Sequence, residues 1–114
     1  MSGSFATSEQ HSHFNLKPLA VASLKRGVYE EAKDLAGDLP GWRVLTADDE
    51  RLRIVCERKG GSLSGTATVT ITCEGPDGIP STVVNVKSET SGGIISRDRK
   101  NVLEFMKLFH RRVC

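Results

Sequence analysis

The stretch Gly65-Thr-Ala-Thr-Val-Thr-Ile-Thr-Cys-Glu74 has the strongest secondary-structure signal in the sequence. Threonine alternates with apolar residues along it, which is the period of two expected for a β-strand with one covered face. This pattern favours an antiparallel sheet, because parallel sheets are usually covered on both faces. The residues expected to face a core are Ala67, Val69, Ile71 and Cys73. Those expected to line the opposite, open face are Thr66, Thr68, Thr70 and Thr72.

Further strands are expected on both sides of this stretch. Residues 42–47 and 51–58 precede it and residues 81–88 follow it, and turn sequences rich in Asp, Gly or Pro separate them. A short earlier strand is expected to end near Pro18, because proline cannot donate a backbone hydrogen bond to a sheet. The strands from residue 42 onward are close enough in sequence to form a meander.

Two segments have the residue spacing of an amphipathic helix. Residues 20–39 place apolar side chains three and four apart, with Ser23 as the expected N-cap. The second helix is expected from Ser96 or Asp98 to residue 112, and its apolar stripe consists of Val102, Phe105, Met106 and Phe109. The predicted order is β-α-β-β-β-β-α. We therefore predict an α+β fold in which both helices pack on one face of an antiparallel sheet.

Length and composition fit one small domain. The chain has 114 residues, 38% hydrophobic and 26% charged, which excludes collagen-like, coiled-coil and wholly disordered classes. Residues 13–114 are expected to form a single α+β domain, and residues 1–12 a flexible N-terminal tail. No apolar run is long enough to span a membrane and no signal peptide is visible, so a cytoplasmic location is expected. The net charge of +2 is too small to indicate nucleic-acid binding.

The cysteines and histidines do not form a recognisable catalytic or metal-binding motif. The three cysteines are not arranged in CxxC pairs, so no metal site and no cofactor is expected. Cys56 and Cys73 are expected to be buried thiols, which a disulfide could join only if their strands were neighbours. No catalytic residue can be assigned from spacing, and whether the protein is an enzyme stays open.

The segment between the last strand and the last helix has the one pattern that favours a small-ligand site. The segment from Thr90 to Gly93 is expected to end the sheet, and Ser96 and two arginines follow at a helix N-terminus. Backbone N–H groups there could hold a phosphate or a carboxylate. The other interpretation is a simple strand-to-helix turn with a capped helix. The candidate anion-binding residues are Ser91, Gly92, Gly93, Ser96 and Arg97.

Charge is distributed unevenly along the chain. Residues 30–50 hold seven acids against Lys33 and Arg43, whereas residues 97–112 hold six Lys or Arg against Asp98 and Glu104. Patches of opposite sign could dock copies of the protein on one another or meet a charged partner. The alternative is two ordinary solvated faces.

Three sequence segments resemble a known family. These are Leu39-Pro-Gly-Trp-Arg-Val44, Val84-Asn-Val-Lys-Ser-Glu-Thr-Ser91 and Ser96-Arg-Asp-Arg-Lys-Asn101, the last followed by a Phe-rich helix. Together they resemble domain-of-unknown-function family 1499. That resemblance implies no activity, because the family has no agreed function. The expected strand order is also similar to the TATA-binding-protein-like and helix-grip folds.

Three functions are compatible with these patterns. The first is a non-catalytic interaction module that binds a protein partner or self-associates, as a homodimer, through the threonine face of the sheet. The second is a protein that binds a small apolar ligand in a cavity between the sheet and the C-terminal helix. The third is an enzyme or binder acting on an anionic ligand at the loop over residues 91–99. The identity of any ligand or protein partner cannot be read from the sequence.

Overall fold

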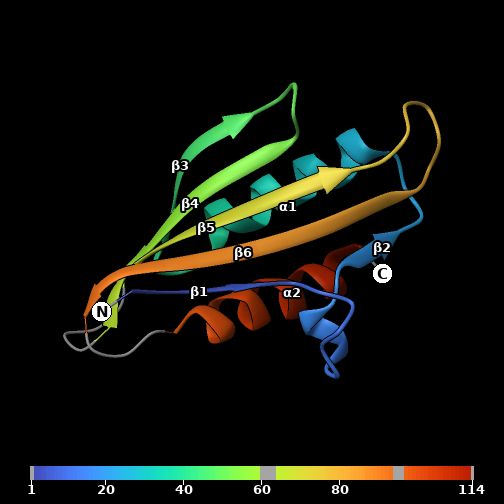
Figure 1. Cartoon of the computed structure of the whole chain (residues 1–114). Helices are drawn as coiled ribbons and strands as arrows, with labels where there is room; N and C mark the ends of the chain where they lie inside the picture. Colours follow the sequence, from blue (N-terminus) through green and yellow to red (C-terminus); the bar gives the residue numbers. More distant parts are fainter. Residues whose placement is uncertain (1, 60–63, 94–96, 114) are drawn as a thin grey trace.

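A computed structural model describes residues 2–59, 64–93 and 97–113, and in these residues six strands form one sheet with two helices on one face (Figure 1). The predicted α+β fold is confirmed. The elements, in chain order, are β1 (Ser2–Ala6), the short 3-10 helix η1 (Phe14–Leu16), β2 (Leu19–Val21), α1 (Lys25–Asp38), β3 (Trp42–Asp48), β4 (Arg53–Lys59), β5 (Ser64–Glu74), β6 (Thr82–Gly93) and α2 (Asp98–Val113).

The sheet is antiparallel throughout, in the order β1-β6-β5-β4-β3. The strands from β3 to β6 form the expected meander. Both β1 and β2 pair with the same edge of β6, at different ends: Ala6 lies opposite Lys87, and Leu19 lies opposite Val84. The long strand β6 therefore has partners on both sides, and β3 is the outer strand on the other side of the sheet.

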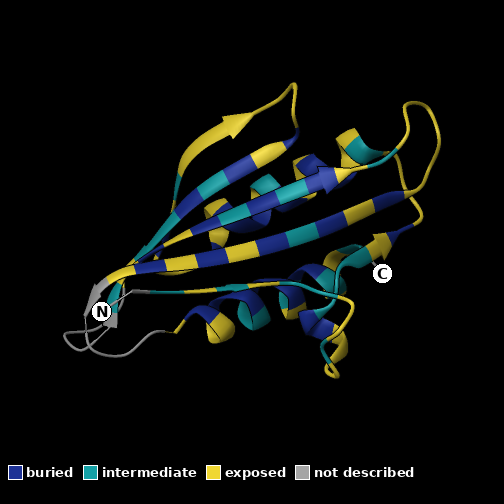
Figure 2. Ribbon diagram, viewed as in Figure 1, coloured by how far each residue is buried: buried dark blue, intermediate teal, exposed yellow. Residues whose placement is uncertain are grey.

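The core lies between the inner face of the sheet and the two helices, as the alternation predicts (Figure 2). Ile54, Ile71 and Val86 point inward from three neighbouring strands and are at most 1% exposed. Tyr29 of α1 and Phe109 of α2 meet them and are fully buried. Burying one such side chain contributes about 1.5–3 kcal/mol. The two helices therefore attach to the sheet mainly through apolar contact.

The N-terminal residues differ from the expected flexible tail, since Ser2–Ala6 form β1. Their backbone pairs with β6 and so covers one of its edges. Phe5 packs partly against the core and stacks on the His11 ring, with 4.7 Å between ring centroids. The Thr7 hydroxyl donates a hydrogen bond to Asn85 Oδ1 at 2.7 Å. These contacts attach the segment to a strand some 80 residues later.

The start of α1 also differs from the prediction. Residues 14–16 form a 3-10 helix instead of a strand, and the strand is β2, after Pro18. Because β2 uses residues up to Val21, α1 begins only at Lys25. Ser23 does not cap the helix; its carbonyl oxygen accepts a hydrogen bond from the Thr82 hydroxyl at 2.7 Å. Within the described residues, no helix is both long and apolar enough to cross a lipid bilayer.

Candidate functional site

Four polar side chains are buried together between β6 and the first turn of α2. Ser88, Thr90, Asp98 and Asn101 are each at most 5% exposed, although the surrounding interior is apolar. We call these four residues the polar cluster. Buried polar groups are costly unless they are hydrogen-bonded, so their arrangement demands a physical account.

Two periodicities bring the polar cluster together: the two-residue period of strand β6 and the helical turn of α2. The expected strand ends at Ser88, but β6 continues to Gly93. Ser88 and Thr90 therefore extend the inward-facing series that includes Val84 and Val86. Asp98 is the first residue of α2, and Asn101 follows one turn later on the same buried side.

Within the cluster, the hydroxyl groups of the strand donate to the carboxylate of the helix. Ser88 Oγ and Thr90 Oγ1 both donate to Asp98 Oδ1, at 2.6 and 2.5 Å. The Asn101 amide in turn donates to Ser88 Oγ at 3.2 Å. Hydrogen bonds to a charged acceptor are stronger than those between neutral groups. The end of β6 is therefore tied directly to the start of α2.

A second set of contacts extends the network to β4 and β3. Arg58 Nε donates to Asn101 Oδ1 at 3.1 Å and lies 3.3 Å from Glu104 Oε1. Trp42 Nε1 donates to the same Glu104 oxygen at 2.9 Å. The Arg58 guanidinium also lies 5.9 Å from the Trp42 ring centroid, within the range of a cation–π contact. Arg58 and Glu104 are partly exposed, so the network runs from the interior to the surface.

An aromatic wall and one small side chain adjoin the cluster. Trp42 and Phe105 lie 6.0 Å apart between ring centroids, and Phe105 stacks on Phe109 at 5.4 Å. Ala67 points inward from β5 and lies opposite both Arg58 and Thr90 in the sheet. The site therefore combines apolar ring surfaces with a few fixed hydrogen-bonding groups, which is the usual composition of a small-molecule pocket.

The candidate anion-binding residues are placed differently from the expected loop. Ser91, Gly92 and Gly93 belong to β6, and Ser91 lies between Ser2 and Thr66 in the sheet. Arg97 is exposed just before α2, while Ser96 lies outside the described residues. An anion site at these residues stays a prediction. The sequence prediction missed the inward-facing Ser88 and Thr90; the continued alternation after Val86 was the signal for them.

The threonine face of β5 is the more exposed face of the strand, as predicted, because its threonines alternate with buried residues (Figure 2). A hollow of about 460 Å³ lies over it, lined in part by Thr70, Thr72, Arg53, Asn85 and Lys87. Charged side chains therefore flank the threonines. The use of this face as an interface stays a prediction.

The two central cysteines are buried, unreactive thiols. Burial raises the pKa of Cys56 to about 11 and that of Cys73 to about 12, so neither is a thiolate at neutral pH. Their strands are neighbours, but Cys56 lies opposite Val69, four residues before Cys73 on β5. That offset is roughly 13 Å along a strand, too far for a disulfide. In the described part of the chain, no group of three or more His, Cys, Asp or Glu could hold a metal ion.

Comparisons with known proteins identify the fold. No family model matches the sequence, and no curated protein matches it either, so the resemblance to family 1499 stays a prediction. A Thalictrum flavum norcoclaurine synthase mutant, in complex with a transition-state analogue, matches with a TM-score of 0.57 and 14% identity, over 98% of this chain and 96% of that one. The ZhuI aromatase/cyclase from Streptomyces sp. R1128 matches with a TM-score of 0.56 and 11% identity, over 98% and 86%. Both have helix-grip-like folds, and this chain shares that architecture.

Proposed function

We propose that this protein binds a small, largely apolar molecule between the sheet and α2, at the polar cluster. The observation that carries the proposal is the enclosure of this hydrogen-bonded cluster beside the aromatic wall of Trp42 and Phe105. The names of the two structural neighbours support it, since one is a synthase that holds a transition-state analogue and the other is an aromatase/cyclase.

The packing of the core limits where such a ligand would lie. Ile54, Ile71, Val86 and Phe109 fill the middle of the interior and are at most 1% exposed. The ligand would therefore lie toward the cluster end, beside the small side chain of Ala67. A ring or short alkyl group would contact the aromatic wall, and one polar group would hydrogen-bond with the cluster. We propose binding without catalysis. A catalytic serine needs a histidine between its hydroxyl and the carboxylate to act as the base, whereas Ser88 and Thr90 donate directly to the Asp98 carboxylate.

Native mass spectrometry of protein purified gently from its host tests this proposal. We expect a few hundred daltons of additional bound mass for each 12.4 kDa chain. The Ala67→Leu variant, purified in the same way, should fold and lose that mass, because the larger side chain would occupy the ligand's space. A wild-type protein without bound mass, or an Ala67→Leu variant that keeps it, would contradict the proposal.

Ala36→Leu is the matched control. Ala36 is fully buried on α1 in the packed core. The added methylenes should lower stability there by about 1–3 kcal/mol, because a filled core has no room for them. If the cluster end has room for a ligand, Ala67→Leu should lower the free energy of unfolding by less than Ala36→Leu does. Equal losses would mean that both positions are equally well packed, and the ligand site would be rejected.

Self-association through the threonine face is a second candidate, and one observation favours it. Lys87 and Glu89 lie side by side on β6, flanking Thr70 and Thr68 respectively. A two-fold axis between these two rows would place Lys87 of one copy over Glu89 of the other. Replacing Thr68 and Thr70 with lysine should then convert a dimer to a monomer. An unchanged mass would exclude this interface.

The anionic-ligand alternative at residues 91–99 has its own test. Arg97 is exposed beside the start of α2, where it could contact a phosphate. Inorganic phosphate should then raise the melting temperature of the wild-type protein but not that of Arg97→Ala. A rise that persists in the variant would exclude Arg97 from the site.

A further inference from the structure

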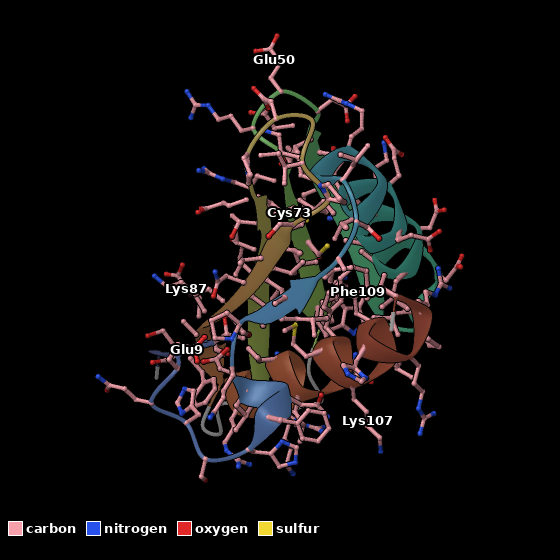
Figure 3. All side chains as sticks on the ribbon, turned by 90° about the vertical axis from the view of Figure 1, so that its right-hand side faces the viewer. Glu9, Glu50, Cys73, Lys87, Lys107 and Phe109 are labelled. Atoms are coloured by element: carbon pink, nitrogen blue, oxygen red, sulfur yellow. The ribbon has the colours of Figure 1, made fainter. Side chains whose placement is uncertain are left out.

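We propose that two copies of this chain pack their helix layers against each other, with α1 of each copy docked on α2 of the other. This contact is distinct from the ligand site and from the threonine face. It follows from the outer surfaces of the two helices, which lie next to each other on one side of the sheet (Figures 1 and 3).

The outer surface of α1 is acidic. Its exposed carboxylates form what we call the acidic ridge, which consists of Glu30, Glu31, Asp34 and Asp38. Glu30 contacts Lys33 at 3.4 Å, and Asp38 contacts Arg112 at 3.1 Å. Glu31 and Asp34 form no ion pair with any residue that the structure describes. The ridge therefore keeps an excess of negative charge.

The outer surface of α2 is basic. Three of its exposed cations form what we call the basic ridge, which consists of Lys100, Lys107 and Arg111. Among the described residues, none of these three side chains has an ion-pair partner. Lys107 projects into solvent (Figure 3). The basic ridge borders a groove of about 360 Å³ that includes the half-buried Leu103 and Leu108.

Two glycines on α1 provide an independent argument for a partner. Gly27 and Gly37 are exposed, and a Cβ added at either would meet no atom within 4 Å. Neither has a positive φ, so the fold itself does not require glycine at these positions. Glycine in a helix is less stable than alanine, but it permits another backbone to approach closely. A partner helix lying against α1 would account for both residues.

The geometry favours a closed dimer. The helices have 14 and 16 residues, so each is roughly 20–24 Å long and the two ridges match in length. Asp34 and Asp38 are four residues apart, as are Lys107 and Arg111, so the charges have the same spacing along both ridges. A two-fold axis running between the helices would place each acidic ridge on a basic ridge, forming the same contact twice.

Sedimentation velocity at low and high salt measures the mass of the protein and so tests for the dimer. We expect twice the 12.4 kDa monomer mass in about 20 mM NaCl and a shift toward the monomer in about 500 mM, because salt screens exposed charges. Glu31→Lys with Asp34→Lys should be monomeric, and so should Lys107→Glu with Arg111→Glu. An equimolar mixture of these two variants should form a heterodimer of two chains, because both contacts are then between opposite charges.

Three outcomes would overturn the proposal: a monomeric wild-type protein at low salt, dimerisation of either charge-reversed variant alone, or a mixture that stays monomeric. The matched control reverses two cations of the opposite face, Arg53→Glu with Lys87→Glu, and should leave the dimer intact. Loss of the dimer in this control would assign the interface to the sheet. Gly37→Leu should also weaken the dimer without changing any charge, while the monomer keeps its melting temperature.

Discussion

Two carboxylates in this molecule accept hydrogen bonds of similar length from hydroxyl groups, but in opposite surroundings. Asp98 is 2% exposed and accepts from Ser88 and Thr90, whereas the side chain of Asp49 is 64% exposed and accepts from Tyr29 at 2.6 Å. Water can replace a lost partner at Asp49 but cannot reach Asp98 without local opening. Although their lengths are similar, the hydrogen bonds to Asp98 should therefore contribute more to the free energy of unfolding than the hydrogen bond to Asp49.

Removing the buried carboxylate should have the largest effect. Asp98→Ala leaves the Ser88 and Thr90 hydroxyls without their carboxylate acceptor in the interior. We expect the free energy of unfolding to fall by roughly 3–5 kcal/mol, since two hydrogen bonds to a charged acceptor are lost. Denaturant unfolding measures this loss. Asp34→Ala, on the exposed side of α1, is the control and should change stability by no more than about 0.5 kcal/mol. If Asp98→Ala and Asp34→Ala lowered the free energy of unfolding by similar amounts, burial of the carboxylate would not matter and the comparison would be wrong.

The apolar framework around Asp98 could be predicted from the sequence, because it depends on short-range periodicity. The alternation of β5 and the apolar stripe of α2 each fix which side of an element is buried, and the structure confirms both. The polar cluster could not be predicted in the same way. The sequence predicts an anion-binding loop or a strand-to-helix turn at this place, because small polar residues beside two glycines usually end a strand.

The missed elements share one physical cause, namely dependence on distant pairing. Strand β6 continues through Gly93 because β1 pairs with it on one side and β5 on the other. Strand β1 exists, in turn, because that edge of β6 is available to it. Neither segment has a strong local strand signal, so each forms only in the presence of a partner tens of residues away. Local strand propensity therefore predicts too early an end for β6 and does not predict β1.

Removing one buried hydroxyl should have an intermediate effect. Thr90→Val keeps the shape of the side chain but removes one of the two β6 hydroxyls that donate to Asp98 in the described residues. We expect stability to fall by about 1.5–3 kcal/mol, the contribution of one hydrogen bond to a charged group. Thr68→Val, on the exposed face of the same sheet, is the control and should be nearly neutral. If Thr90→Val were as stable as wild type, the bond to Asp98 would contribute nothing and the cluster would not tie β6 to α2.

The hydrogen bond to the exposed Asp49 should show the smallest effect, and that effect should depend on pH. Tyr29→Phe deletes the hydroxyl that donates to Asp49, and this hydrogen bond is the main reason that the pKa of Asp49 lies below its usual value. A carboxylate with a lowered pKa in the folded state adds stability above its unfolded pKa of about 4, and that stability is lost as pH falls through the folded pKa.

The melting temperature of Tyr29→Phe should therefore be slightly lower than that of wild type at pH 7, and the difference should shrink as pH falls below about 4. Tyr29 itself does not titrate in this range, because burial and its bond to Asp49 raise its pKa. Thermal melts of both proteins between pH 7 and pH 2 measure the difference. A gap that stays constant with pH would mean that the hydroxyl–carboxylate bond does not account for the effect. A gap at pH 7 as large as that of Thr90→Val would show that exposure does not weaken the bond.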